Sequence, residues 1–256
     1  MTHAGYVTAP PAHANLLLIG ARAPVPGECK TRLGASIGMA EAATLYRAFL
    51  IDLASRFTGK PGHETRNYDV AWAHTPDGDF AKVLRDCGCP EPFSPVMFVP
   101  QAGEGWGARQ ANLLRWGDDH GYVRTVLVAS DAPHVSPGIV AQAFASLEAN
   151  DVVLARSLDG GYSLIGMRGY HDILSGVPMS TTSAGDALLA RARALGLRVG
   201  ETAVIFDVDE AADLDLLIAT LAPDGMYAPA TWSVLRSLGL LPESSLQRSV
   251  PPPGGE

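Results

Sequence analysis

The chain has 256 residues, of which 47% are hydrophobic and 18% are charged, so its composition is that of a globular protein and excludes a disordered one. Its formal net charge of −8 argues against general affinity for nucleic acid or for an anionic membrane. Three cysteines form no disulfide framework, and the sequence contains no signal peptide and no apolar run of membrane-spanning length, so we expect a cytoplasmic protein with reduced thiols.

Apolar, strand-like runs alternate with helical patterns along most of the chain. Strands are predicted at residues 15–21, 69–76, 96–101, 125–131, 151–157, 162–167 and 203–209, and helices at 39–57, 108–121, 137–149, 183–196 and 210–222. This alternation predicts one α/β domain over residues 15–240, with a mostly parallel sheet and helices on both faces. A flexible leader at 1–14 and a disordered tail at 241–256 are expected to flank it. In such a sheet ligands bind outside the carboxyl ends of the strands.

The loop after the first strand, "GARAPVPGECKTRLG" at residues 20–34, concentrates the cations Arg22, Lys30 and Arg32 in an acidic protein. Pro24 and Gly27 bend its backbone, so that N–H groups and cations can meet the phosphates of a nucleotide. The alternative is an ordinary surface loop, which would leave positive charge unfavourably placed at a helix start. The loop is neither a Walker A sequence nor GxGxxG.

Three aspartates are candidate ligands of Mg²⁺ or Mn²⁺. Asp131 follows the apolar run "VLVAS", where a carboxylate has no packing purpose, although it can also form a turn before the next proline. Asp207 and Asp209 alternate along the last predicted strand, so we expect them to share one face and to complete the site with Asp131. Asp209 can instead favour the start of the following helix.

Two glycine-rich stretches are candidate substrate contacts. In "PQAGEGWGARQ" at residues 100–110, glycines allow close backbone approach to a flat ring and a glutamine can contact a base edge, while a flexible connector is the alternative. The candidate residues there are Gln101, Gly103, Gly107 and Arg109. In "RSLDGGYSLIG" at residues 156–166, Asp-Gly predicts a hairpin turn, which does not exclude backbone amides that face a substrate.

Taken together, "APVPGECKTRL", "EAATLYRAFLIDL", "ASDAPHVSP", "DVVLARSLDGGYSLIG", "GVPMSTT" and "DVDEAADL" resemble the DUF2064 family of glycosyltransferase-like proteins, akin to 2-phospho-lactate guanylyltransferase. The resemblance implies the GT-A, Rossmann-like fold of the nucleotide-diphospho-sugar transferases. It implies that Arg22, Pro24, Gly27, Lys30, Arg32, Gln101, Gly103, Gly107 and Arg109 bind the nucleotide. It also implies that Asp131, Asp207 and Asp209 bind the metal, and that Asp159, Gly160, Gly161, Tyr162, Ser180 and Thr181 bind the acceptor.

The sequence favours a metal-dependent nucleotidyl transfer, for which Lys30, Arg32 and Asp131 are the candidate catalytic residues. An oxyanion of a small acceptor would attack the α-phosphorus of a nucleoside triphosphate and pyrophosphate would leave. A glycosyltransferase with an NDP-sugar donor is the alternative, and a non-catalytic nucleotide-binding module is the third interpretation. The expected partners are the nucleotide and the acceptor, with neither nucleic acid nor membrane. The oligomeric state is left open, and a homodimer is one option.

Overall fold

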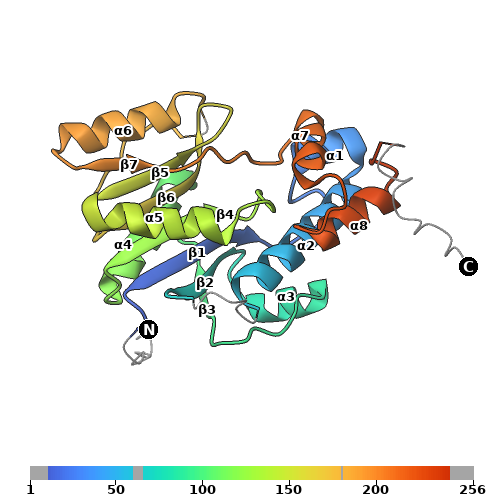
Figure 1. Ribbon diagram of the computed structural model, residues 1–256, viewed down its shortest axis with the longest axis horizontal. Coiled ribbons are helices and arrows are strands. Elements are labelled where there is room, and N and C mark those ends of the chain that lie inside the picture. The colour runs from blue at the N-terminus through green and yellow to red at the C-terminus, as the bar shows by residue number, and fades with distance from the viewer. Residues whose placement is uncertain (1–10, 60–65, 180, 243–256) are drawn as a thin grey trace, which may run out of the picture.

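The structure is a computed structural model that describes residues 11–59, 66–179 and 181–242. Its strands form one sheet in the order β3-β2-β1-β4-β6-β5-β7 (Figure 1). β1 lies parallel between β2 and β4, β3 is parallel to β2, and β7 is parallel to β5, whereas β6 runs antiparallel to β4 and β5. The bounds are β1 Asn15–Arg22, β2 Asp69–Thr75, β3 Met97–Pro100, β4 Arg124–Ala129, β5 Val152–Arg156, β6 Tyr162–Arg168 and β7 Val199–Glu201. The predicted α/β class and mostly parallel sheet are confirmed.

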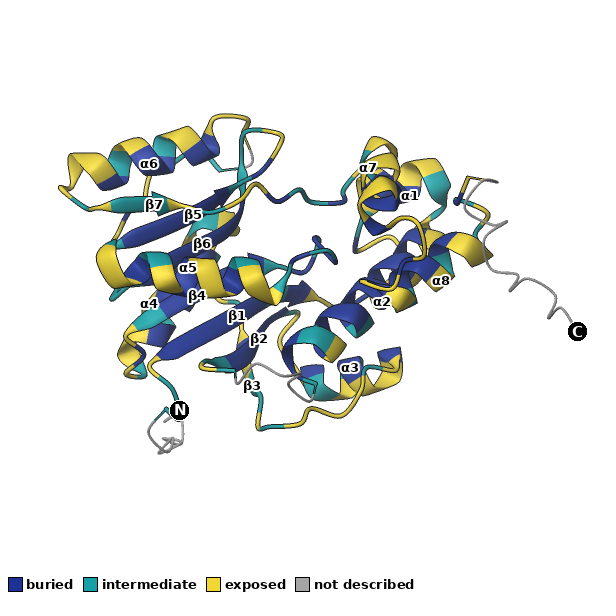
Figure 2. Ribbon diagram, in the orientation of Figure 1, coloured by how far each residue is buried: buried dark blue, intermediate teal, exposed yellow. Residues whose placement is uncertain are grey.

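Helices cover both faces of this sheet. They are α1 Thr31–Ile37, α2 Met39–Phe57, α3 Phe80–Cys87, α4 Gly105–Asp119, α5 Pro137–Ala149, α6 Ala184–Ala194, α7 Ala211–Leu221 and α8 Pro229–Ser237. Leu17 and Ile19 of β1 lie in the core layer that includes α2, α3, α5, α7 and α8, whereas Leu16 and Leu18 lie in the layer that includes α4 and α6. The central strands are therefore buried along their length (Figure 2), which explains their continuous apolar runs.

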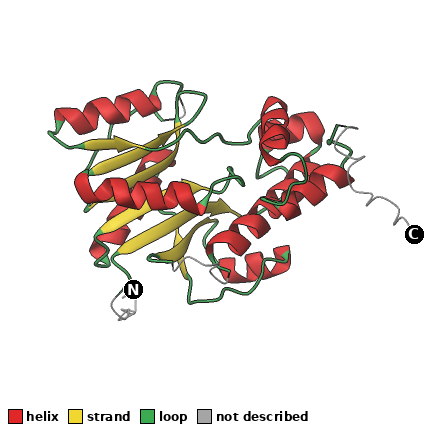
Figure 3. Cartoon of the chain, viewed as in Figure 1, coloured by secondary structure: helices red, strands yellow, loops and turns green. Residues whose placement is uncertain are grey.

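The strand predicted at residues 203–209 is wrong. The strand beside β5 is the short β7, and the chain then continues to α7 as a loop, which Figure 3 shows crossing toward the helices at the other end of the molecule. Ile205 and Val208 are buried in the core, so this stretch is apolar because it is covered and not because it pairs as a strand. The argument that Asp207 and Asp209 share one strand face therefore fails, and their positions have another cause.

Other boundaries differ in ways that affect the site. β4 ends at Ala129, so Asp131 lies in the turn after the strand and not on it. The helices α1, α3 and α8 were not predicted. Residues 1–10 of the expected leader and 243–256 of the expected tail lie outside the described residues. None of the described helices combines the length and apolarity needed to cross a bilayer.

Candidate functional site

The carboxyl ends of β1 and β4 form the floor of the site. These strands are parallel neighbours, and Ser130 donates its backbone N–H to the carbonyl of Gly20 at 2.9 Å. The connection between β7 and α7 crosses the same edge, where Val208 donates its N–H to the carbonyl of Asp131 at 3.0 Å. This backbone contact brings the Asp207 and Asp209 segment beside Asp131, as the sequence predicts for the two carboxylate sources.

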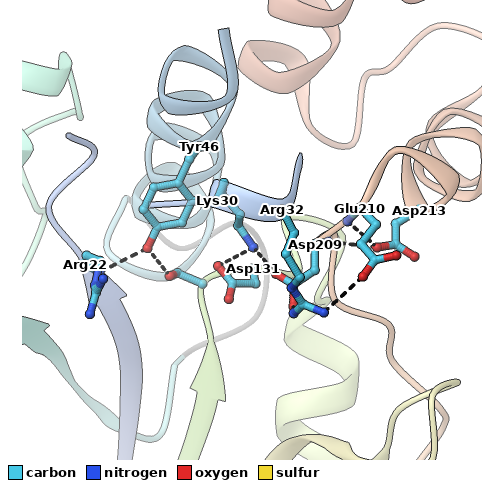
Figure 4. Close-up of polar contacts among 9 residues, drawn as sticks. Arg22, Lys30, Arg32, Tyr46, Asp131, Asp209, Glu210 and Asp213 are labelled. Atoms are coloured by element: carbon cyan, nitrogen blue, oxygen red, sulfur yellow. Dashed lines mark hydrogen bonds and ion pairs between the residues drawn. The ribbon is translucent and has the colours of Figure 1, made fainter. Parts of the chain in front are cut away.

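Lys30 lies between two of the candidate metal ligands (Figure 4). Its Nζ is 2.7 Å from Asp131 Oδ1 and 2.9 Å from Asp209 Oδ1, and only 4% of its side chain is exposed. Burial acts to lower the pKa of Lys30, but the two carboxylates outweigh it and raise the pKa above the usual lysine value. The ammonium is therefore charged, and it bonds both carboxylates in this structure.

Arg32 binds the outer side of the same cluster. One guanidinium nitrogen is 2.6 Å from Asp209 Oδ2 and another is 3.1 Å from Glu210 Oε1, while 65% of the side chain remains exposed. Burial opposes ionisation of Asp209, but Lys30 and Arg32 lower its pKa below the usual value. The cap of α7 is formed by Glu210 and Asp213, whose side chains bond N-terminal backbone groups. The Asp209 carboxylate thus serves the cluster rather than the helix start.

Asp207 is the most perturbed acid of the cluster. Its Oδ1 atom is buried and has no hydrogen-bond partner among the described residues. Burial and, next, the charge of Asp131 raise the pKa of Asp207 to about 7. Across the described residues no three acidic, histidine or cysteine side chains are gathered closely enough to hold a metal ion. The ammonium of Lys30 instead occupies the space between Asp131 and Asp209.

Tyr46 of α2 belongs to the site, although its sequence position suggests only an apolar helix face. Its hydroxyl accepts the backbone N–H of Arg22 at 3.0 Å and lies 2.6 Å from Ser130 Oγ. The ring lies beneath Lys30, with Nζ 5.7 Å from the centroid. A buried tyrosine requires a partner for its hydroxyl, so a tyrosine within an otherwise apolar stripe was the available signal.

A cavity of about 290 Å³ opens over this edge on the side of β1 and β2. Five of the predicted nucleotide-binding residues line it: Arg22, Lys30, Arg32, Gln101 and Arg109. Four others do not: Pro24, Gly27, Gly103 and Gly107. The lining residues that were not predicted include Tyr46, Thr75, Trp106 and Ser130.

The residues outside the cavity have structural roles. Gly27 and Gly103 have φ angles of 78° and 123°, which favour glycine in a turn. Gly107 lies in the first turn of α4, where an added Cβ would come within 3.1 Å of Met179. Much of the glycine-rich stretch at residues 100–110 is therefore the start of a helix and not a flexible connector.

Gln101 lines this cavity and has one side-chain atom without a hydrogen-bond partner among the described residues. Its side-chain NH₂ donates to the carbonyls of Ala73 at 2.8 Å and Ala21 at 3.3 Å. Its Oε1 is buried with no partner among the described residues. An acceptor in this position can receive a bond from an N–H group of a nucleobase, whereas the NH₂ end is already committed to β1 and β2.

A second cavity, of about 740 Å³, adjoins the first on the side of β6 and α6. Four predicted acceptor residues line it: Asp159, Gly161, Tyr162 and Thr181. Gly160 does not line it, and Ser180 lies outside the described residues. The predicted turn is present between the antiparallel strands β5 and β6, where Asp159 Oδ1 accepts the N–H of Gly161 at 2.9 Å. Both cavities are bordered by Arg32, Trp106, Asp131 and Asp209.

Comparison with known proteins confirms the resemblance drawn from the sequence. Residues 64–181 match the DUF2064 family, described as an uncharacterized protein conserved in bacteria. No curated protein matches the chain. A crystal structure from Desulfovibrio desulfuricans G20, provisionally named a nucleotide-diphospho-sugar transferase, is 28% identical, with a TM-score of 0.77 over 89% of this chain and 96% of that one. The two chains share the fold.

Two further solved structures are similar more loosely. A cytidylyltransferase from Leptospira borgpetersenii serovar Hardjo-bovis is 10% identical, with a TM-score of 0.47 over 93% of this chain and 99% of that one. A 4-diphosphocytidyl-2C-methyl-D-erythritol synthase is 12% identical, with a TM-score of 0.49 over 82% of this chain and 99% of that one. Similarity at this level carries no argument about the chemistry of this chain.

Proposed function

We propose that this protein is a nucleotidyltransferase, which transfers the nucleotidyl group of a nucleoside triphosphate to a small acceptor bearing a phosphate or another oxyanion. The observation that carries the proposal is that two cavities meet at one cluster of cations and carboxylates. Arg32 and Asp131 border both cavities, so a donor in the smaller one and an acceptor in the larger one would face each other across the cluster. This arrangement suits an in-line displacement at phosphorus.

The cations of the cluster retain donors for phosphate oxygens. The ammonium of Lys30 has three N–H donors and bonds two carboxylates, while the guanidinium of Arg32 has five and also bonds two. In the proposed reaction an acceptor oxygen forms a bond to the α-phosphorus as the bond to the bridging oxygen of pyrophosphate breaks. Lys30 and Arg32 would stabilise the charge that develops on the departing pyrophosphate.

The three aspartates are oxygen donors of the kind that a hard divalent cation such as Mg²⁺ or Mn²⁺ prefers, although in this structure Lys30 occupies the space between Asp131 and Asp209. Asp131, Asp207 and Asp209 supply carboxylate oxygens, and the buried Oδ1 of Asp207 has no hydrogen-bond partner among the described residues. These three residues would hold the ion, which would neutralise charge on the donor phosphates.

Glycosyl transfer from an NDP-sugar is the second candidate function. It is favoured by one specific observation, which is the name of the Desulfovibrio protein that shares 28% of its sequence with this chain. A diphosphate would then leave from the same cluster, and the larger cavity would receive the sugar and its acceptor. A non-catalytic nucleotide-binding module is the remaining possibility and predicts binding without turnover.

A thermal-shift panel of nucleoside triphosphates and NDP-sugars, with Mg²⁺ and with a chelator, tests the proposal. A ligand that binds the folded state raises its stability according to affinity and concentration. Stabilisation by a triphosphate, followed by acceptor-dependent release of pyrophosphate, is the expected result. Stabilisation by NDP-sugars alone would favour glycosyl transfer, and stabilisation with no release under any acceptor would favour a binding module.

Alanine substitution of Lys30 and Arg32 tests the phosphate contact. Each should weaken nucleotide binding or turnover by about tenfold to hundredfold, since a charge-assisted hydrogen bond contributes roughly 1.5–3 kcal/mol. Lys82→Ala is the matched control, because Lys82 is an exposed lysine that pairs only with Asp86 of its own helix among the described residues. Unchanged binding in both variants would remove the strongest support for this function.

A further inference from the structure

The cluster contains a cation of its own before any ligand arrives. Three aspartates from two distant parts of the chain meet at the sheet edge, and the ammonium of Lys30 bonds one oxygen each of Asp131 and Asp209. The exposed Arg32 completes the outer side by bonding Asp209 and Glu210. Such a gathering of carboxylates requires a compensating positive charge, and here the protein supplies it.

The backbone is strained to place that charge. Lys30 has a φ of 49° and is the sole non-glycine among the described residues with a positive φ. This left-handed conformation is costly for a residue with a Cβ and persists where the surrounding structure enforces it. It directs a lysine side chain that is only 4% exposed into the carboxylates. The position of the ammonium is therefore a built feature and not the chance conformation of a surface lysine.

The same oxygens cannot hold both cations. A divalent ion binds carboxylate oxygens at roughly 2.0–2.6 Å, and the ammonium lies 2.7 and 2.9 Å from Asp131 Oδ1 and Asp209 Oδ1. Two positive charges would then be within a few ångströms of each other in a partly buried space, where their repulsion is only weakly screened. Binding of the ion at these aspartates requires that Lys30 leave.

We propose that Lys30 is the resident cation of the Asp131–Asp209 pair and that it excludes a divalent ion from these carboxylates until donor phosphates draw its ammonium away. The second half of this inference rests on the proposed nucleotide site. The long, unbranched side chain can move its head by rotation about its own bonds, while the loop remains in place. By reciprocity, a ligand that removes Lys30 from the carboxylates strengthens binding of the ion, and the ion strengthens binding of that ligand.

Binding of Mn²⁺ without nucleotide tests the exclusion. The signal of free Mn²⁺ in electron paramagnetic resonance gives the affinity for the wild type, for Lys30→Met and for the control Lys82→Met. Lys30→Met should bind Mn²⁺ about 5- to 150-fold more tightly than the other two, which is the range of a typical coupling between two sites. Equal affinities in all three proteins would overturn the inference.

Stability gives a second readout if the variant folds poorly. Removal of the ammonium leaves uncompensated carboxylates, so Lys30→Met and the polar Lys30→Gln should melt at lower temperature than the wild type. Mn²⁺ should restore both melting temperatures and leave that of the wild type nearly unchanged. If Mn²⁺ rescues neither variant, the ion does not take the place of the ammonium and the inference fails.

The coupling to nucleotide is measured from the gain in triphosphate affinity when Mn²⁺ replaces a chelator. This gain should be smaller in Lys30→Met than in the wild type, and chelation of the ion by the nucleotide is the same in both. Tighter Mn²⁺ binding by the variant, with no response of any protein to triphosphates or NDP-sugars, would leave the exclusion standing and refute the proposed function. Stabilisation by triphosphate with no Mn²⁺ gain in the variant would refute the exclusion alone.

Discussion

Tyr46→Phe should destabilise the protein by removing one buried hydroxyl. This hydroxyl joins three parts of the fold, because Tyr46 belongs to α2, accepts the N–H of Arg22 at the end of β1, and bonds Ser130 after β4. Tyr46 is only 2% exposed. A phenylalanine fills the same space, so the change removes the hydrogen bonds with little effect on packing.

The magnitude follows from what each partner loses. The hydroxyl of Ser130 can rotate toward another acceptor, whereas the backbone N–H of Arg22 is fixed and would lose its partner. A buried donor left without a partner costs about 1–3 kcal/mol. For a domain of this size, about 2 kcal/mol corresponds to a decrease in melting temperature of roughly 4–8 °C.

Urea unfolding of the wild type, Tyr46→Phe and Tyr68→Phe measures this effect. Tyr68 is a suitable control because its ring stacks on Phe144 at 5.5 Å and its hydroxyl makes no recorded hydrogen bond within the described part of the chain. Tyr46→Phe should lower the free energy of unfolding by about 2 kcal/mol and the control by much less. A change within about 0.5 kcal/mol, which is typical of a surface substitution, would show that the hydroxyl does not hold β1 and β4 to α2.

Three other variants probe separate parts of the molecule. Gln101→Leu should weaken nucleotide binding, measured by titration, because it removes a buried acceptor beside the smaller cavity that has no partner among the described residues. Gly160→Ala should impair acceptor use more than nucleotide affinity in steady-state kinetics, because an added Cβ would lie 1.9 Å from the carbonyl of Thr182, beside the larger cavity. Burial, and then the charge of Arg56, lower the pKa of His134 to about 4. As pH falls from about 6.5 to about 4, His134 therefore binds a proton in the unfolded chain before it does so in the folded chain. The free energy of unfolding decreases by up to about 3 kcal/mol over this range. Denaturation at several pH values should show a smaller loss for His134→Phe, which retains an aromatic ring against Phe206.

The central strands could be predicted because both of their faces are buried. In β1 and β4 every second side chain meets one helix layer and the others meet the opposite layer, so an apolar run is required. β7 has three residues, none of which is fully buried, so its sequence carries no such pattern. The stretch at residues 203–209 carries the pattern without the strand, because Ile205 and Val208 lie on a crossing loop and are buried in the core.

The members of the site could be predicted more readily than their pairing. Charges that follow apolar strands mark the carboxyl edge of the sheet, and this rule selected Lys30 and Asp131, whereas Asp209 was selected from a predicted strand that the structure lacks. The rule gives no distances, and Lys30 and Asp209 are 179 positions apart in the chain. The sequence therefore indicated a basic loop open to phosphate, whereas the structure shows that loop bonded to the acids of the far segment.

This pairing changes what the basic loop can attract. Lys30 and Arg32 are paired with Asp131, Asp209 and Glu210, so the cluster carries no excess of positive charge for a polyphosphate. A bare triphosphate would meet carboxylates as well as cations. A triphosphate that arrives with a divalent ion brings phosphate oxygens for the cations and a positive charge for the carboxylates. Alanine at Lys30 would remove the phosphate contact and the internal counter-ion together, so a loss of activity would not separate these roles. Affinity for Mn²⁺ in Lys30→Met separates them, because the two roles predict different results: loss of a phosphate ligand leaves Mn²⁺ binding unchanged, and loss of a resident cation strengthens it.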